Sequence, residues 1–99
     1  MMKLIITNTA NDGINKGKRW YNKQQENLGF KFADYIYECF EEIRNRPLGY
    51  ASKHRYTREM VVKKYPYIII YTLEENIVFI MKVFPCRTDP KKKYKRIKK

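Results

Sequence analysis

The segment 56–90 constrains the fold more than any other, because β-branched and aromatic residues are concentrated there. Two apolar runs, at 65–73 and 77–84, are separated by three polar residues at 74–76. Runs of this length joined by a short polar turn are typical of a β-hairpin. A further run at 60–62 predicts another strand beside them. The sequence therefore predicts a three-stranded antiparallel sheet in this segment.

A short strand and two helices are predicted before this sheet. Residues 3–7 form an apolar strand, and a polar helix follows from Ala10 to about Gln25. Gly13 and Gly17 lower the helix propensity of that segment. The helix predicted from Phe30 to Arg46 is stronger, because its large apolar residues repeat at spacings of three and four. The predicted fold is α+β, with an N-terminal strand and a helical hairpin packed on one face of the sheet.

The chain is strongly basic for a single domain of 99 residues. Its formal net charge is +12, of which residues 91–99 carry +7. These last residues are predicted to form a basic tail that frays. A positive field of this size favours polyanions such as nucleic acid, the ribosome or an acidic protein. With no long apolar run and only two cysteines, we expect a cytoplasmic protein with no membrane partner.

Several classes of catalytic site are disfavoured by the residues present. One histidine, His54, and two distant cysteines do not make a zinc site, and no glycine-rich phosphate loop occurs. We therefore expect neither a metal nor another cofactor. Glu38 and Glu42 lie one helical turn apart, and their spacing is typical of a solvated helix face.

Cationic and aromatic side chains remain as candidates for function. The candidate basic groups flank the predicted strands, and Tyr94 lies among the last of them: Lys53, His54, Arg55, Arg58, Arg87, Lys91, Lys92 and Lys93. Residues 48–55 are predicted to be a connecting loop. If the strands bring these groups to one end of the sheet, they suit a phosphodiester, since Arg and Lys bind phosphate oxygens. A solubilising basic surface is the alternative. The tyrosines at 65, 67 and 71 are predicted to pack in the fold rather than stack on bases.

The order and spacing of these features resemble the RelE/ParE superfamily of bacterial toxins over nearly the whole chain. The residues that carry the resemblance are Trp20, Tyr21, Phe32, Ile43, Pro47, Arg58, Tyr65, Pro66, Tyr67, Tyr71, Val83, Arg87, Thr88, Asp89 and Pro90. The Tyr-Pro-Tyr segment and the closing Arg-Thr-Asp-Pro are most similar to the ParE-like branch.

The resemblance implies the toxin of a type II toxin–antitoxin module, bound by an antitoxin with an acidic, partly disordered C-terminal segment. ParE-like members act on DNA gyrase, whereas RelE-like members are metal-independent ribonucleases that cut mRNA on the ribosome. In the ribonuclease alternative, Arg58, Arg87 and Tyr94 are the implied catalytic residues, and the groups at 53–55 and 91–93 bind the target. Ile68 stands where such ribonucleases tend to have an arginine, which favours the action on gyrase. A binding module without toxicity is the third alternative.

Overall fold

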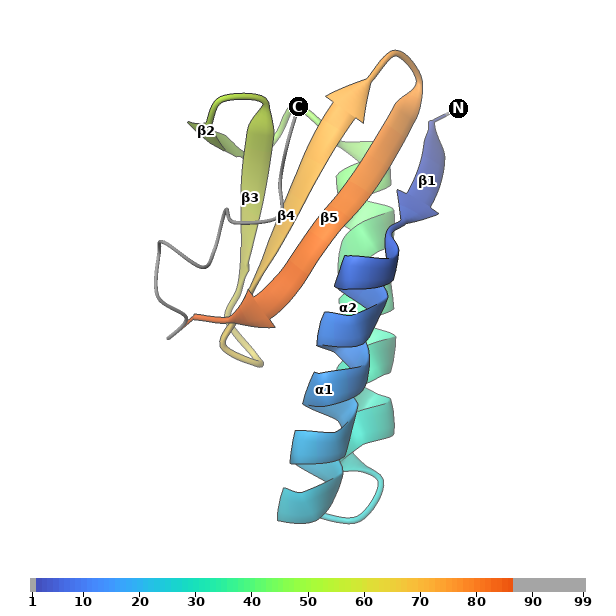
Figure 1. Ribbon diagram of the computed structural model, residues 1–99, viewed down its shortest axis with the longest axis vertical. Coiled ribbons are helices and arrows are strands. Elements are labelled where there is room, and N and C mark those ends of the chain that lie inside the picture. Colours follow the sequence, from blue (N-terminus) through green and yellow to red (C-terminus); the bar gives the residue numbers. More distant parts are fainter. Residues whose placement is uncertain (1, 87–99) are drawn as a thin grey trace.

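A computed structural model describes residues 2–86 of the chain, which form a two-layer α+β structure (Figure 1). Its elements are, in order, β1 (Lys3–Ile6), α1 (Asn8–Gln24), α2 (Leu28–Asn45), β2 (Ala51–His54), β3 (Thr57–Val62), β4 (Tyr67–Glu74) and β5 (Ile77–Pro85). The two helices form a hairpin that covers one face of the sheet and extends past the end where β5 stops. The predicted fold class is confirmed.

The sheet has five strands in the order β1-β5-β4-β3-β2. Strands β2 to β5 are antiparallel neighbours, as predicted for the last three. Strand β1 pairs with β5 in parallel, with Lys3 opposite Ile77 and Ile6 opposite Ile80. The N-terminal strand therefore lies at one edge of the sheet, beside the last strand of the chain.

Strand β2 corrects the prediction of a connecting loop at 48–55. All four of its residues are exposed, and it is held by its pairing with β3 rather than by burial. Its register shifts between Ser52 and His54, and Arg55 then turns the chain with a φ of 50°. Hydrophobic alternation cannot reveal a strand that buries no side chain, because the alternating pattern reflects burial.

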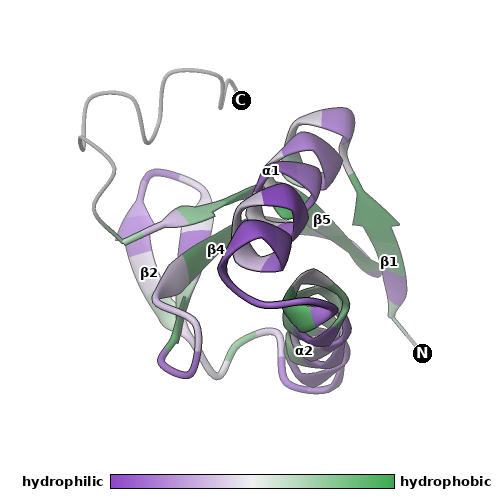
Figure 2. Ribbon diagram, turned by 90° about the horizontal axis from the view of Figure 1, so that it is seen from below, coloured by the Kyte–Doolittle hydropathy of each residue, from purple (hydrophilic) through white to green (hydrophobic). Residues whose placement is uncertain are grey.

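The core lies between the hairpin and the sheet. Its fully buried members include Ile14 of α1, Phe32 and Ile36 of α2, and Ile69 and Ile80 of the sheet. In Figure 2 the outward sides of both helices are hydrophilic, and β1, β4 and β5 are largely hydrophobic. The hairpin is thus held on the sheet by one apolar stripe from each helix.

Close backbone packing between α1 and β5 depends on glycine. A Cβ atom on Gly13 would overlap the carbonyl oxygen of Val83 and lie 3.1 Å from its carbonyl carbon. One turn later, a Cβ on Gly17 would lie 2.5 Å from the ring of Phe32. These two glycines cost helix propensity, but Gly13 allows α1 to approach the backbone of β5, and Gly17 makes room for the Phe32 ring of α2.

Threonine 7 connects the start of α1 to the same strand. Its hydroxyl accepts a hydrogen bond from the N–H of Ala10 at 3.2 Å, which caps the helix. The same hydroxyl lies 2.9 Å from the carbonyl oxygen of Ile80 and donates to it. The first turn of α1 is therefore fixed to β5 directly.

Candidate functional site

Arg58, one of the predicted catalytic residues, lies near the start of β3 and holds a loop. It is half-buried on β3, opposite Tyr71 of β4. Its Nη1 atom donates a hydrogen bond of 2.8 Å to the carbonyl oxygen of Tyr50. The Tyr71 hydroxyl donates to the carbonyl oxygen of Pro47, in the same segment. Both side chains thus attach the chain that follows α2 to the sheet.

The tyrosines near Arg58 hold their protons firmly. Burial raises the pKa of Tyr71 to about 12, and the nearby Arg58 guanidinium only partly opposes this effect. Burial also raises the pKa of Tyr50, with a further contribution from Glu42. The Tyr50 hydroxyl donates to the Glu42 carboxylate at 3.3 Å. Both phenols are neutral near pH 7 and suit hydrogen-bond donation rather than proton abstraction.

The predicted basic groups at 53–55 lie at the other end of the sheet from the end of β5. Thr57, directly after this turn, is opposite Thr72 of β4, and Thr72 is opposite Phe79 of β5. Pro85 lies six residues further along β5, a distance of about 20 Å at roughly 3.3 Å per residue. The strand register therefore does not bring Lys53, His54 and Arg55 to the end of β5. Arg87, Lys91, Lys92, Lys93 and Tyr94 lie outside the described residues.

Three predicted packing residues are buried in the fold. Tyr65 and Tyr67 are each 7% exposed, and Tyr71 is fully buried. Tyr65 and Tyr67 pack against Phe32, with ring centroids 5.4 and 4.8 Å apart. The prediction that these tyrosines pack in the fold is confirmed.

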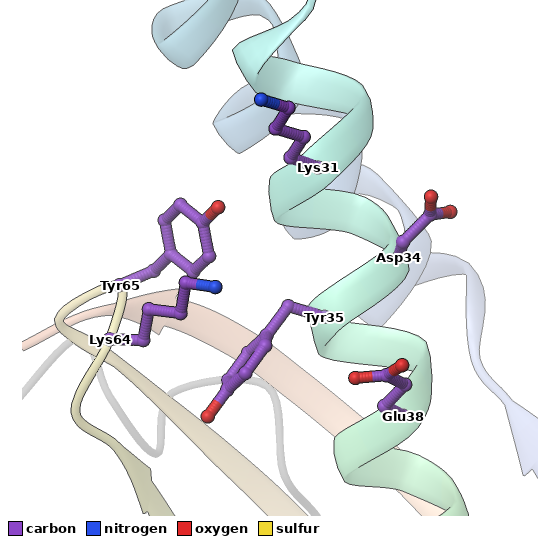
Figure 3. A pocket seen from close by; sticks show the side chains of 6 residues that line it. All are labelled: Lys31, Asp34, Tyr35, Glu38, Lys64 and Tyr65. Atoms are coloured by element: carbon purple, nitrogen blue, oxygen red, sulfur yellow. The ribbon is translucent and has the colours of Figure 1, made fainter.

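A groove between α2 and the turn that joins β3 to β4 is a feature that the sequence did not indicate. The residues around it are Lys31, Asp34, Tyr35, Glu38, Lys64 and Tyr65. The Lys64 ammonium lies 5.1 Å from the centroid of the Tyr35 ring and 5.9 Å from that of Tyr65 (Figure 3). Tyr35 and Lys64 belong to separate elements, and only the folded chain brings them together.

The groove is open and small. Its volume of about 240 Å³ is below the roughly 300–1,000 Å³ of common small-molecule sites. Figure 3 shows the Asp34 carboxylate pointing away from Lys64 and Tyr65. Two lysines, two phenolic rings and the Glu38 carboxylate therefore line a space that fits one or two side chains of a partner. Such a space suits a carboxylate-bearing peptide.

The described residues contain neither a candidate metal site nor a membrane-spanning helix. Within residues 2–86, no three His, Cys, Asp or Glu side chains cluster in a way that could hold a metal ion. Among the same residues, no helix is long and apolar enough to cross a membrane.

Sequence comparison assigns the chain to a family. Residues 4–90 match the family described as the ParE toxin of the type II toxin–antitoxin system, parDE. The chain belongs to the ParE toxin family. The predicted membership in the RelE/ParE superfamily, closest to the ParE-like branch, is confirmed. A comparison with curated protein sequences finds no match.

A solved structure has the same fold as this ParE family member. It is described as a chromosomal ParDE TA system from P. aeruginosa, and it aligns with a TM-score of 0.75 at 17% sequence identity. The alignment covers 86% of this chain and 96% of the other. The protein is the toxin component of a type II toxin–antitoxin system, and a cognate antitoxin is its partner.

Proposed function

We propose that this toxin stops growth in the cytoplasm by acting on DNA gyrase. The observation that carries the proposal is the match to the ParE toxin family over residues 4–90. The sequence supports it at Ile68, which is half-buried on β4 where ribonucleases of the superfamily tend to place an arginine. The described residues support it too, because Arg58 is engaged by a backbone carbonyl and the phenol of Tyr71 holds its proton.

Purified toxin distinguishes gyrase from the ribosome as its target. We expect it to inhibit supercoiling by gyrase, or to trap cleaved DNA on the enzyme, and to leave translation in a cell-free extract unaffected. Adding the cognate antitoxin should restore gyrase activity, which controls for contaminating nucleases. Cleavage of ribosome-bound mRNA with unaffected gyrase would instead establish the ribonuclease alternative. Inactivity in both assays, together with growth that is unaffected by induction, would leave the non-toxic binding module.

We propose the groove beside α2 as a binding site for part of the antitoxin. An acidic, partly disordered segment would place a carboxylate between Lys31 and Lys64 as it orders on the toxin. Arg58 is a weaker candidate for such pairing, since it already donates to Tyr50. Arg87 and the tail lysines remain candidates outside the described residues.

Reversing the charges of the two lysines in the groove tests this binding site. The double variant Lys31→Glu/Lys64→Glu should weaken antitoxin binding by tenfold or more, since truncating or reversing a paired charge costs about 2–5 kcal/mol in well-desolvated interfaces and less at a rim. The matched control is Lys3→Glu/Arg46→Glu, because both residues are exposed and lie away from the groove. If the two double variants weakened antitoxin binding equally, only the net charge would matter, and the groove would not be the binding site.

A further inference from the structure

The net positive charge of the described residues is confined to one part of the molecule. We call residues 16–35 together with 63–66 the hairpin lobe; it comprises the free end of the helical hairpin and the neighbouring turn between β3 and β4. Its basic residues are Lys16, Lys18, Arg19, Lys23, Lys31, Lys63 and Lys64. Only Glu26 and Asp34 oppose them. Elsewhere in residues 2–86, seven basic and seven acidic side chains cancel. The hairpin lobe therefore dominates the electrostatic field of the described fold.

Four residues of the hairpin lobe form a continuous stripe on α1. Lys16, Arg19, Trp20 and Lys23 have the spacing i, i+3, i+4, i+7, which places them on one side of a helix. All four are exposed, and Trp20 keeps 56% of its surface accessible. Within the part of the chain that the structure describes, none of the three basic side chains forms an ion pair. The stripe presents uncompensated charge and one large aromatic ring to solvent.

The backbone behind the stripe is rigidly held. The opposite side of α1 buries Ala10, Ile14 and Gly17 against the rest of the fold. This leaves no free apolar face with which α1 could enter a lipid interface, as an amphipathic membrane helix must. Trp20 itself packs edge-on against Tyr21, with ring centroids 5.0 Å apart. The helix thus holds the Cα positions of the stripe in a fixed array, unlike a flexible tail.

We propose that this stripe binds the phosphate backbone of double-stranded DNA without regard to sequence. From Lys16 to Lys23 the helix advances about 10.5 Å at roughly 1.5 Å per residue. Duplex DNA presents a charge about every 1.7 Å along its axis, so a rigid helix of this length faces several phosphates at once. An acidic peptide fits less well, because a disordered segment needs apolar burial to offset its ordering entropy, and the stripe offers only Trp20. The proposal goes beyond the action on gyrase and requires only DNA for its test.

The salt dependence of binding gives the expected magnitude. Each phosphate contact contributes about 0.9 to the slope of log affinity against log salt concentration. The variant Arg19→Gln/Lys23→Gln should therefore reduce the slope by nearly two. Between 50 and 200 mM salt, the affinity of the variant should fall about tenfold less than that of the wild type.

The single tryptophan of the chain reports on the stripe directly. We would titrate the full-length toxin with a short duplex DNA of arbitrary sequence and follow tryptophan emission under selective excitation, with fluorescence anisotropy of labelled DNA in parallel. Binding at the stripe should change Trp20 emission over the same concentration range in which anisotropy rises. Lys3→Gln/Arg46→Gln removes the same charge from exposed positions outside the hairpin lobe and serves as the control.

Three results would overturn the proposal. The first is anisotropy that saturates while Trp20 emission stays constant, which would place the DNA on another surface such as the basic tail. The second is an equal loss of salt slope in the stripe variant and in the control. The third is a Trp20 response to anionic phospholipid vesicles in the absence of any response to DNA, which would identify a lipid surface as the partner. Failure of gyrase inhibition would leave all these readouts unaffected.

Discussion

Replacing Gly13 by alanine should destabilise the toxin, although alanine is the better helix former. The helix propensity of alanine alone would favour the variant by about 1 kcal/mol. Against this, the new methyl group would overlap the carbonyl oxygen of Val83, an atom that belongs to the backbone of β5 and cannot rotate away. Overpacking a core costs typically about 1–3 kcal/mol, and we expect the upper end here. The net loss should be about 2 kcal/mol, or roughly 8–16 °C in melting temperature for a domain of this size.

Chemical denaturation followed by circular dichroism measures this loss, with two variants on the same helix for comparison. Asn15 is exposed on α1, so Asn15→Ala should stabilise the fold by about 0.5 kcal/mol through propensity alone. Gly17→Ala should be milder than Gly13→Ala, because its methyl group would meet the side chains of Phe32 and Tyr67 rather than a backbone atom. If Gly13→Ala were as stable as the wild type, the close approach of α1 to β5 would not be what requires glycine there.

Three further predictions concern side chains near the candidate site and the cysteines. Arg58→Gln should cost about 1–2 kcal/mol of unfolding free energy by removing the hydrogen bond to Tyr50, and a loss of toxicity at unchanged stability would instead favour a catalytic role. The free energy of unfolding should fall as pH rises from about 10 to about 12, because the folded chain keeps the Tyr71 proton that the unfolded chain releases. This decline should be smaller in the variant Tyr71→Phe. An unchanged decline in that variant would contradict the assignment to Tyr71. In native protein a thiol reagent should modify exposed Cys86 and spare Cys39, because Cys39 is buried and its pKa is raised to about 11. Rapid modification of both thiols would show that α2 opens readily.

Most of the fold could be predicted from the sequence because burial leaves a periodic signal. The apolar repeat of α2 and the dense runs of β4 and β5 are visible as patterns, and the structure buries the residues that make them. Strand β2 has no such signal, since all of its side chains are exposed. Gly13 and Gly17 could be recognised only as weak helix formers. The atoms that pack against them belong to β5 and α2, which are distant in sequence.

The candidate site was less predictable, because it depends on which strand ends meet. The basic residues at 53–55 are evident in the sequence, but only the register of β3, β4 and β5 shows how far they lie from Pro85. The role of Arg58 in holding the loop at Tyr50 also needs coordinates. The stripe on α1 is different. Its i, i+3, i+4, i+7 spacing can be read directly, but only the structure shows that this side of the helix is exposed.

The pairing of β1 with β5 has a consequence for how the toxin is made. Residues 3–6 pair with residues 77–80, which are synthesised much later, and α1 packs against the same strand, β5. At a synthesis rate of about 5–20 residues per second, roughly 4–15 s pass before β5 is even polymerised. Until then, α1 lacks the strand that accepts its Thr7 hydrogen bond and packs against Gly13. We therefore expect the complete two-layer fold to form only after β5 has been synthesised.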